Sequence, residues 1–299
     1  MKIGYPCINL SLDCKGDRTF RLKSYSEERL VEIVDNNLNC LFEILRFNVA
    51  HNLLFFRITS DLVPFASHPI CKFDWQSHFH NKFQEIGNYI RTNDIRISMH
   101  PDQFTLINSP DKGVFERSLQ ELIYHAHVLD LMELNTSAKI QLHIGGVYKD
   151  KITSINIFVE RFNELPDLVS KRLVIENDDR SYTLQDCLEV SSITDIPILL
   201  DSFHHEVKNS GESQAEAVSL ASSTWRQEDG ILMIDYSYQP GDGRRGAHSY
   251  TMNVDHFTQF LDITKSYDFD IMLEIKDKEK SSLKAVEAAK DDKRFVMAI

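Results

Sequence analysis

The sequence contains little glycine and proline, no long apolar stretch and no signal for secretion. Its 299 residues include 11 Gly and 8 Pro, which excludes a collagen-like or low-complexity chain. No run approaches the roughly 18–20 apolar residues that a membrane span requires. The first residues, MKIGYPCINL, lack the apolar core of a signal peptide. We therefore expect no association with a membrane.

The cysteines are few and scattered, and none forms a CxxC pair. This spacing argues against a disulfide framework and against a thiolate zinc site. We therefore expect a chain from a reducing cytoplasm, near the nucleoid if the source is a prokaryote. The cysteines are Cys7, Cys14, Cys40, Cys71 and Cys187.

The remaining composition is that of a globular protein with an acidic surplus. Hydrophobic residues make up 42% and charged residues 26%, enough for a large buried core. The 33 Lys and Arg against 45 Asp and Glu give a formal net charge of −12. Taken as a sum, this charge argues weakly against a nucleic-acid partner, because phosphates are normally bound by basic surfaces.

Short β-branched apolar runs alternate with stretches of helical periodicity, such as residues 26–47 and 114–134. This alternation predicts an α/β fold, a single (β/α)8 TIM barrel over residues 1–299 with its active site at the C-terminal end of the barrel. A doubly wound sheet is the alternative, but the first run is followed by Pro6-Cys7-Ile8-Asn9 and not by a glycine-rich turn. The runs are 2–5, 53–59, 96–100, 139–143, 172–177, 196–201, 230–237 and 270–275.

Ionisable side chains stand at the ends of successive predicted strands. Since the carboxyl ends of barrel strands converge, these side chains are expected to meet although they are distant in sequence. Two histidines, His204 and His248, follow the sixth and seventh strands. The residues at the strand ends are His100, His143, Glu176, Asp201, Asp235 and Glu274.

This combination of carboxylates and imidazoles predicts a metal centre. Four carboxylates at one end of a barrel would repel each other unless cations neutralised them. Two or three divalent ions that share a bridging carboxylate fit the number of ligands, and such clusters catalyse phosphodiester hydrolysis. Each residue alone has a structural explanation, as when Asp201 caps a helix, but their joint occurrence favours metal binding. By contrast, His125, His127 and His256 lie in helical stretches and are expected to be structural.

The motifs resemble the UV-damage endonuclease family over nearly the whole chain. The most specific are His100-Pro101-Asp102-Gln103-Phe104 and Glu176-Asn177-Asp178. The resemblance implies a DNA repair endonuclease, on a barrel similar to that of endonuclease IV, that nicks DNA immediately 5′ to a cyclobutane pyrimidine dimer or (6-4) photoproduct. It implies Mn²⁺ as the metal, with Mg²⁺ or Zn²⁺ as alternatives. The other matching segments are GYPCIN (4–9), RITS (57–60), PFASH (64–68), HIGG (143–146), DSFHH (201–205), GAHS (246–249) and EIKDK (274–278).

The resemblance also implies roles for individual residues. Tyr5, Asn9 and His68 match residues near the lesion and the scissile phosphate, and we expect them to be catalytic. The residues that match ligand positions are His100, His143, Glu176, Asp201, His204, His248 and Glu274.

Gln103 and Phe104 match a pair that probes the duplex at the damage. An enzyme that acts beside a lesion must take the damaged bases out of the stack, and an aromatic ring can then stack on their orphaned partners. The alternative is that Phe104 packs in the core and Gln103 lies at the rim. Arg244 and Arg245 either grip a phosphate or form a solvated loop tip.

The seventh strand departs from the family pattern. The family reads Lys-x-His-Tyr-Ser, whereas this chain has Met233-Ile234-Asp235-Tyr236-Ser237. Met233 cannot carry the carboxyl modification that a lysine can. Asp235 replaces a histidine with a harder, anionic ligand, which favours Mn²⁺ or Mg²⁺ over Zn²⁺.

Two other function classes stay open. A sugar isomerase or epimerase on a xylose-isomerase-like barrel would use one or two ions in a closed polar pocket and would not need Gln103 and Phe104 on a protruding loop. A non-catalytic barrel that binds DNA or metal is supported only by Met233 and Asp235. The expected partner is double-stranded DNA with UV lesions, bound by a monomer without an obligate protein partner. The acidity then matters locally, because bound cations would make this end of the barrel positive.

Overall fold

The structure, a computed structural model, describes residues 1–241 and 243–298, and in this part of the chain eight parallel strands close into a barrel in the order β1 to β8. Each strand lies within one or two residues of a predicted run, so the predicted fold is confirmed. The strands are β1 (Ile3–Pro6), β2 (Phe55–Ile58), β3 (Arg96–Met99), β4 (Lys139–His143), β5 (Leu173–Glu176), β6 (Ile198–Asp201), β7 (Leu232–Tyr236) and β8 (Phe269–Leu273).

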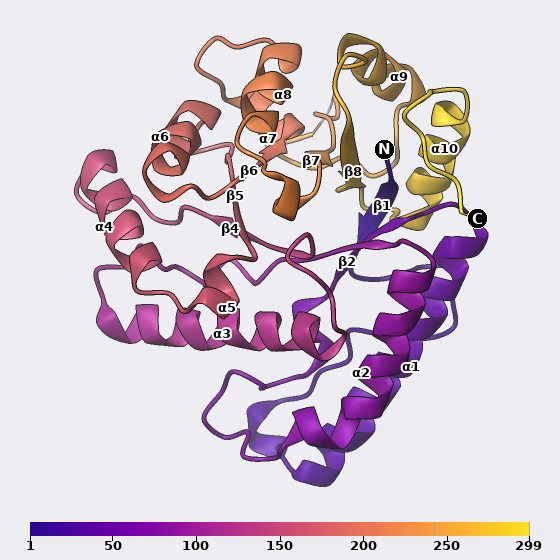
Figure 1. The fold of residues 1–299 in the computed structure, drawn as a ribbon, viewed down its shortest axis with the longest axis vertical. Coiled ribbons are helices and arrows are strands. Elements are labelled where there is room, and N and C mark those ends of the chain that lie inside the picture. The colour runs from indigo at the N-terminus through magenta and orange to yellow at the C-terminus, as the bar shows by residue number, and fades with distance from the viewer. Residues whose placement is uncertain (242, 299) are drawn as a thin grey trace.

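Helices surround the strands, as Figure 1 shows. In α1, Leu30, Val34, Leu38 and Leu41 are buried as the periodicity predicts. No helix in the described residues is long and apolar enough to cross a membrane. The helices are α1 (Glu27–Ala50), α2 (Trp75–Thr92), α3 (Lys112–Leu131), α4 (Lys151–Asn163), α5 (Asp167–Ser170), α6 (Leu184–Thr194), α7 (Ser202–Val207), α8 (Gln214–Ser222), α9 (Val254–Ile263) and α10 (Glu279–Ala289), with 3-10 turns at η1 (Leu22–Ser24), η2 (Ser60–Leu62) and η3 (Gln227–Asp229).

The interior of the barrel is built in layers, because every second residue of a strand faces inward. The middle layer is a separate apolar cluster formed by Phe55, Val174, Leu199, Met233 and Met272. Two residues further along the same strands stand Arg57, Glu176, Asp201, Asp235 and Glu274. The two-residue period of the strands therefore brings these polar side chains together above an apolar floor.

The opposite end of the interior is charged as well. Arg96 Nη1 lies 3.0 Å from Asp270 Oδ2, and Lys139 Nζ lies 2.5 Å from Asp229 Oδ1. All four residues are buried. Oppositely charged pairs thus close the N-terminal end of the barrel.

One finding departs from the expectation for the cysteines. Cys14 and Cys40 form a disulfide across 26 positions of sequence, which links the β1–α1 loop to α1. The two residues meet only because the loop folds back on the helix, so their spacing carries no local signal. Cys7, Cys71 and Cys187 are free thiols.

Candidate active site

Three carboxylates from neighbouring strands form the centre of the site. Glu176, Asp201 and Asp235 are at most 2% exposed, and each offers an oxygen within 4.8 Å of the others. Register explains the arrangement, because Asp201 on β6 is the direct partner of Asp235 on β7. This buried acidic cluster is suited to holding a divalent cation.

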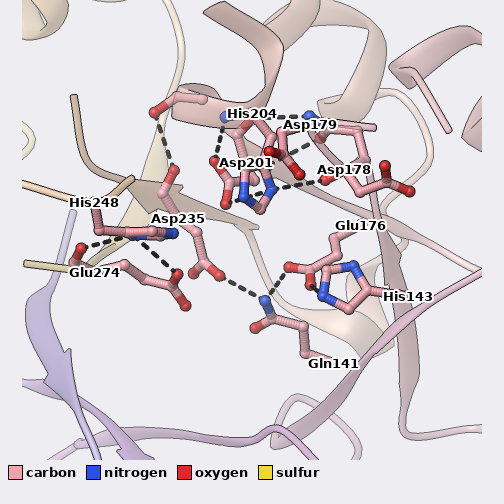
Figure 2. A network of polar contacts seen from close by, with 12 residues as sticks. Gln141, His143, Glu176, Asp178, Asp179, Asp201, His204, Asp235, His248 and Glu274 are labelled. Atoms are coloured by element: carbon pink, nitrogen blue, oxygen red, sulfur yellow. Dashed lines mark hydrogen bonds and ion pairs between the residues drawn. The ribbon is translucent and has the colours of Figure 1, made fainter. Parts of the chain in front are cut away.

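Glu176 also belongs to a second group, with two histidines. His143, its register partner on β4, places Nε2 2.7 Å from Glu176 Oε1, and His100 Nε2 lies 3.2 Å from the same oxygen. Figure 2 shows the His143 ring turned toward Glu176. The three residues offer ligand atoms within 4.8 Å of one another, so Glu176 lies between two groups that could each hold an ion.

His204 is held by Asp201. Asp201 Oδ1 accepts the His204 backbone N–H at 2.7 Å and so caps α7, while Asp201 Oδ2 lies 2.9 Å from His204 Nδ1. The structural explanation of Asp201 as a helix cap is therefore correct, but its second oxygen serves the site. Burial alone would lower the pKa of His204, yet the Asp201 carboxylate raises it to about 11.

His248 and Glu274 complete the cluster at its other side. His248 Nδ1 lies 2.9 Å from the Glu274 carbonyl oxygen and 3.6 Å from Glu274 Oε2. The His248 ring centroid lies 5.8 Å from that of His204. All residues predicted as ligands, from His100 to Glu274, are thus brought to one end of the barrel.

Two residues of this layer were not given a role by the sequence. Arg57 on β2 donates from Nη2 to both carboxylate oxygens of Asp235 at 2.7 Å, and from Nη1 to Glu274 Oε1. Gln141 on β4 donates from Nε2 to Glu176 and, at 2.5 Å, to Asp235, and Figure 2 shows its amide between them. The sequence did carry a signal for these two residues. Each is a polar residue within an otherwise apolar strand, two positions from a residue that faces the barrel interior.

The charges of the cluster are unbalanced. Burial raises the pKa of Asp235; Arg57 opposes the rise, and Glu274 and Glu176 add to it. Burial would also raise the pKa of Glu274, but Arg57 and His248 lower it to about 2. Since Arg57 is the one arginine or lysine that pairs with these four acids in the described structure, this donor set of carboxylates and imidazoles fits divalent ions.

The catalytic predictions Tyr5 and Asn9 make no hydrogen bond to the predicted ligands in the described structure. Tyr5 is fully buried against α1, where its hydroxyl donates to Asn48 Oδ1 at 2.7 Å and accepts from Asn9 Nδ2 at 2.8 Å. Asn9 also accepts the Ser11 backbone N–H, which shapes the loop after β1. His68 lies on an exposed turn after β2, where its Nδ1 accepts the Ile70 backbone N–H. Their catalytic roles stay predictions.

The loop after β3 presents Gln103 and Phe104 to solvent. Phe104 is 74% exposed, and its backbone N–H donates to Asp102 Oδ1 at 2.7 Å. Gln103 is exposed as well. The alternative explanation of Phe104 as core packing is therefore wrong.

Basic side chains border the cluster. A cavity of about 490 Å³ beside it is lined by Arg57, His248, Glu274, Lys276 and Lys278, among others. Arg244 and Arg245 are exposed on the β7–α9 loop, and Arg245 Nη2 donates to the carbonyl of Val207 at 2.7 Å. An open cavity with lysines at its edge suits an anionic polymer such as DNA.

Comparison with known proteins identifies a family that the chain matches. The model of the family described as UV-endonuclease UvdE matches residues 1–295. The chain is 39% identical over 293 residues to the UV DNA damage endonuclease of Clostridium perfringens, covering 97% of this chain and 71% of that protein. It superposes on the crystal structure of SacUVDE with a TM-score of 0.93 and 44% identity, covering 97% of this chain and 98% of that one.

More distant structures share the barrel. Endonuclease IV from Thermus thermophilus gives a TM-score of 0.56 at 12% identity, over 84% of this chain and 93% of that one. A D-psicose 3-epimerase gives 0.55 at 13% identity, over 85% and 94%. At these identities the likeness extends to the fold alone.

Proposed function

The chain belongs to the UV-endonuclease UvdE family and is a UV DNA damage endonuclease, and we propose that it incises double-stranded DNA immediately 5′ to cyclobutane pyrimidine dimers and (6-4) photoproducts. The observation that carries this proposal is the convergence of the family's histidines and acids at one end of the barrel. Buried acids and imidazoles that share Glu176 are the ligands of a hydrolytic metal centre. We propose that the enzyme acts as a monomer.

The proposed ions are two or three, with Mn²⁺ preferred and Mg²⁺ or Zn²⁺ as alternatives. His100, His143 and Glu176 would hold one ion, and Glu176, Asp201 and Asp235 another, with His204, His248 and Glu274 at the edge of the cluster. When bound, such ions lower the pKa of a water molecule and stabilise charge on the attacking and leaving oxygens. The carboxylates among these residues favour Mn²⁺ or Mg²⁺, whereas the imidazoles also suit Zn²⁺.

The proposed contacts with DNA lie on the loops around this centre. Phe104, 74% exposed on a loop that Asp102 stabilises, would stack in the duplex where damaged bases leave it, with Gln103 beside it. Arg244 and Arg245 on one loop, and Lys276 and Lys278 at the cavity edge, would bind backbone phosphates.

The epimerase alternative has less support. A sugar enzyme would enclose a small polar substrate, whereas Phe104 is exposed and basic residues border an open cavity. Epimerases share only the distant fold likeness described above.

The decisive experiment is incision of a duplex that carries one thymine dimer, with the product mapped to the nucleotide. With Mn²⁺ we expect a single nick directly 5′ to the dimer and no nick in the undamaged duplex. A damaged duplex that stays intact with Mn²⁺, Mg²⁺ and Zn²⁺ in turn would contradict the proposal. The double variant Gln103→Ala/Phe104→Ala should lower the preference for damaged DNA by about tenfold to a hundredfold, whereas Ile193→Ala, a control 58% exposed on α6, should not.

A further inference from the structure

Arg57 lies inside the site and has no role in the function proposed so far. Its side chain is 3% exposed, and it rises from β2 two residues after Phe55 of the apolar layer. Its backbone carbonyl accepts the Cys7 N–H at 2.8 Å, which ties the strand to the loop after β1. The guanidinium is therefore a fixed part of the barrel interior and not a mobile surface charge.

The guanidinium occupies the space between two acids. Nη2 lies 2.7 Å from each carboxylate oxygen of Asp235 and from Gln141 Oε1. Nη1 contacts Glu274 Oε1. Arginine stays protonated in proteins and its planar fork suits carboxylates, so both oxygens of Asp235 already have a permanent cationic partner.

This arrangement conflicts with a metal ion on Asp235. An ion bound to either Asp235 oxygen would stand beside the buried guanidinium, and two cations in a water-poor interior repel each other strongly. The acids on the other side of the cluster, Glu176 and Asp201, have no arginine or lysine within ion-pair distance in the described structure and contact histidines instead. Among the described residues, arginine is thus paired with the acids on one side of the cluster only, and histidines, which can give up their proton to a metal ion, face the acids on the other.

We propose that Arg57 is a built-in cation that takes the place of a metal ion at Asp235 and Glu274, so that the centre binds two divalent ions and Asp235 is not a ligand. The two ions lie on the side of Glu176, with His100, His143, Asp201 and His204. This inference rests on the metal centre of the proposed function, and it narrows the ion count and removes Asp235 from the predicted ligands.

Arg57 also acts as a positioning residue, through Gln141. Gln141 Oε1 accepts a hydrogen bond from Arg57, and Gln141 Nε2 donates to Asp235 and to Glu176 Oε2. The Arg57–Asp235 pair therefore fixes which way the amide points, and the amide in turn orients the carboxylate that both ions share. Outer partners of this kind commonly change metal affinity tenfold to a hundredfold when removed.

The test counts manganese per chain by elemental analysis of protein equilibrated with Mn²⁺ in the absence of DNA. We expect two ions in the wild type, two in Asp235→Asn, and fewer than two in the matched control Asp201→Asn. Arg57→Met should bind a third ion, because it exposes Asp235 and Glu274, and Arg57→Met/Asp235→Asn should return to two. Arg57→Lys, which keeps a positive charge, should stay at two.

Loss of an ion in Asp235→Asn would show that Asp235 is a ligand and overturn the inference. The same holds if Arg57→Met binds no additional ion. Should Arg57→Met fail to fold, Asp235→Asn and Arg57→Lys still decide the question. Because no DNA is present, a protein with this metal pattern that does not incise damaged DNA would contradict the proposed function and leave the inference intact, whereas a wild type without bound manganese would remove the metal centre itself.

Discussion

Two charged layers close the barrel interior, one at each end, and they differ in how their charges are matched. At the N-terminal end Arg96 faces Asp270 and Lys139 faces Asp229, at 3.0 and 2.5 Å. Arg96 also donates to the carbonyls of Ile231 and Asp229, and Lys139 to that of Lys171. Each charge there has a partner within the protein.

At the C-terminal end the acids outnumber the fixed cations. Among the described residues, Arg57 is the one arginine or lysine that pairs with this layer, and it contacts Asp235 and Glu274. Glu176 and Asp201 contact histidines, which bind metals when neutral. Burying charge is unfavourable without compensation. A balanced layer can thus be purely structural, whereas a surplus of buried acid indicates a site that requires cations from outside.

The strongest test of this contrast replaces the shared ligand of the acidic layer. Glu176→Ala removes a carboxylate common to both groups of potential ligands, so we expect loss of bound manganese and a fall in the incision rate of at least about a thousandfold, roughly 4 kcal/mol in the barrier. Metal content by elemental analysis and incision of the dimer duplex, normalised to folded protein, measure the two effects.

The matched control is Asp270→Asn, an equally buried acid of the balanced layer. It should lower stability through loss of the Arg96 pair and leave the manganese content unchanged. If Glu176→Ala kept its full manganese content, or if Asp270→Asn lost manganese, the contrast between the layers would be wrong.

A smaller effect is expected from the balanced layer itself. Lys139→Met leaves Asp229 without its cation, and breaking a buried pair from one side costs about 3 kcal/mol or more of unfolding free energy. Burial lowers the pKa of Lys139 while Asp229 opposes the change, so the charged lysine depends on this acid. Urea unfolding in the presence of a chelator measures the loss.

Two further variants separate the pair from the lysine alone. Lys139→Met/Asp229→Asn should recover part of the lost stability, because no unpaired charge then remains buried. Lys171→Met, which removes an exposed pair with Asp167, should change the unfolding free energy by less than about 0.5 kcal/mol. If Lys139→Met and Lys171→Met lost the same unfolding free energy, the buried pair would matter no more for stability than an exposed one, and the contrast would be wrong.

How far the sequence predicts this molecule depends on the range of the contact. The strands and the convergence of His100, Glu176 and Asp201 follow from local apolar runs and from the geometry of a barrel, so they could be predicted. The Arg57–Asp235 pair joins β2 to β7, and the Cys14–Cys40 disulfide joins a loop to a helix. Such partners depend on which residues face inward at the same height, and no local pattern encodes that.

Tyr5 shows a second limit of prediction from sequence. Its neighbours Gly4 and Pro6 alternate with it along β1, and the alternation turns Tyr5 outward to Asn48 on α1. The run of residues 4–9 matches the family motif as a string, but the string does not say which face each residue takes. A one-residue difference in register decides which face of the strand a side chain takes.

The smallest predicted effect compares a histidine outside the acidic layer with those inside it. Asp201 raises the pKa of His204, whereas burial in α3 lowers the pKa of His125 to about 4, although the Glu121 carbonyl that Nδ1 contacts at 2.8 Å favours the charged ring. Below its ordinary value near 6.5 the unfolded chain protonates His125 and the folded chain does not. The contribution of His125 to stability is therefore complete above pH 6.5 and falls as the pH drops toward 4, by roughly 2 kcal/mol at pH 5.

The test is His125→Asn, whose amide can still donate to Glu121. In chelator-treated protein this variant should lose about 2 kcal/mol less unfolding free energy between pH 7 and pH 5 than the wild type. His127→Asn, at a partly exposed position on the same helix, should lose as much as the wild type. If His125→Asn were as sensitive to acid as the wild type, the loss of stability at low pH would come from the acidic layer of the barrel and not from His125 in α3.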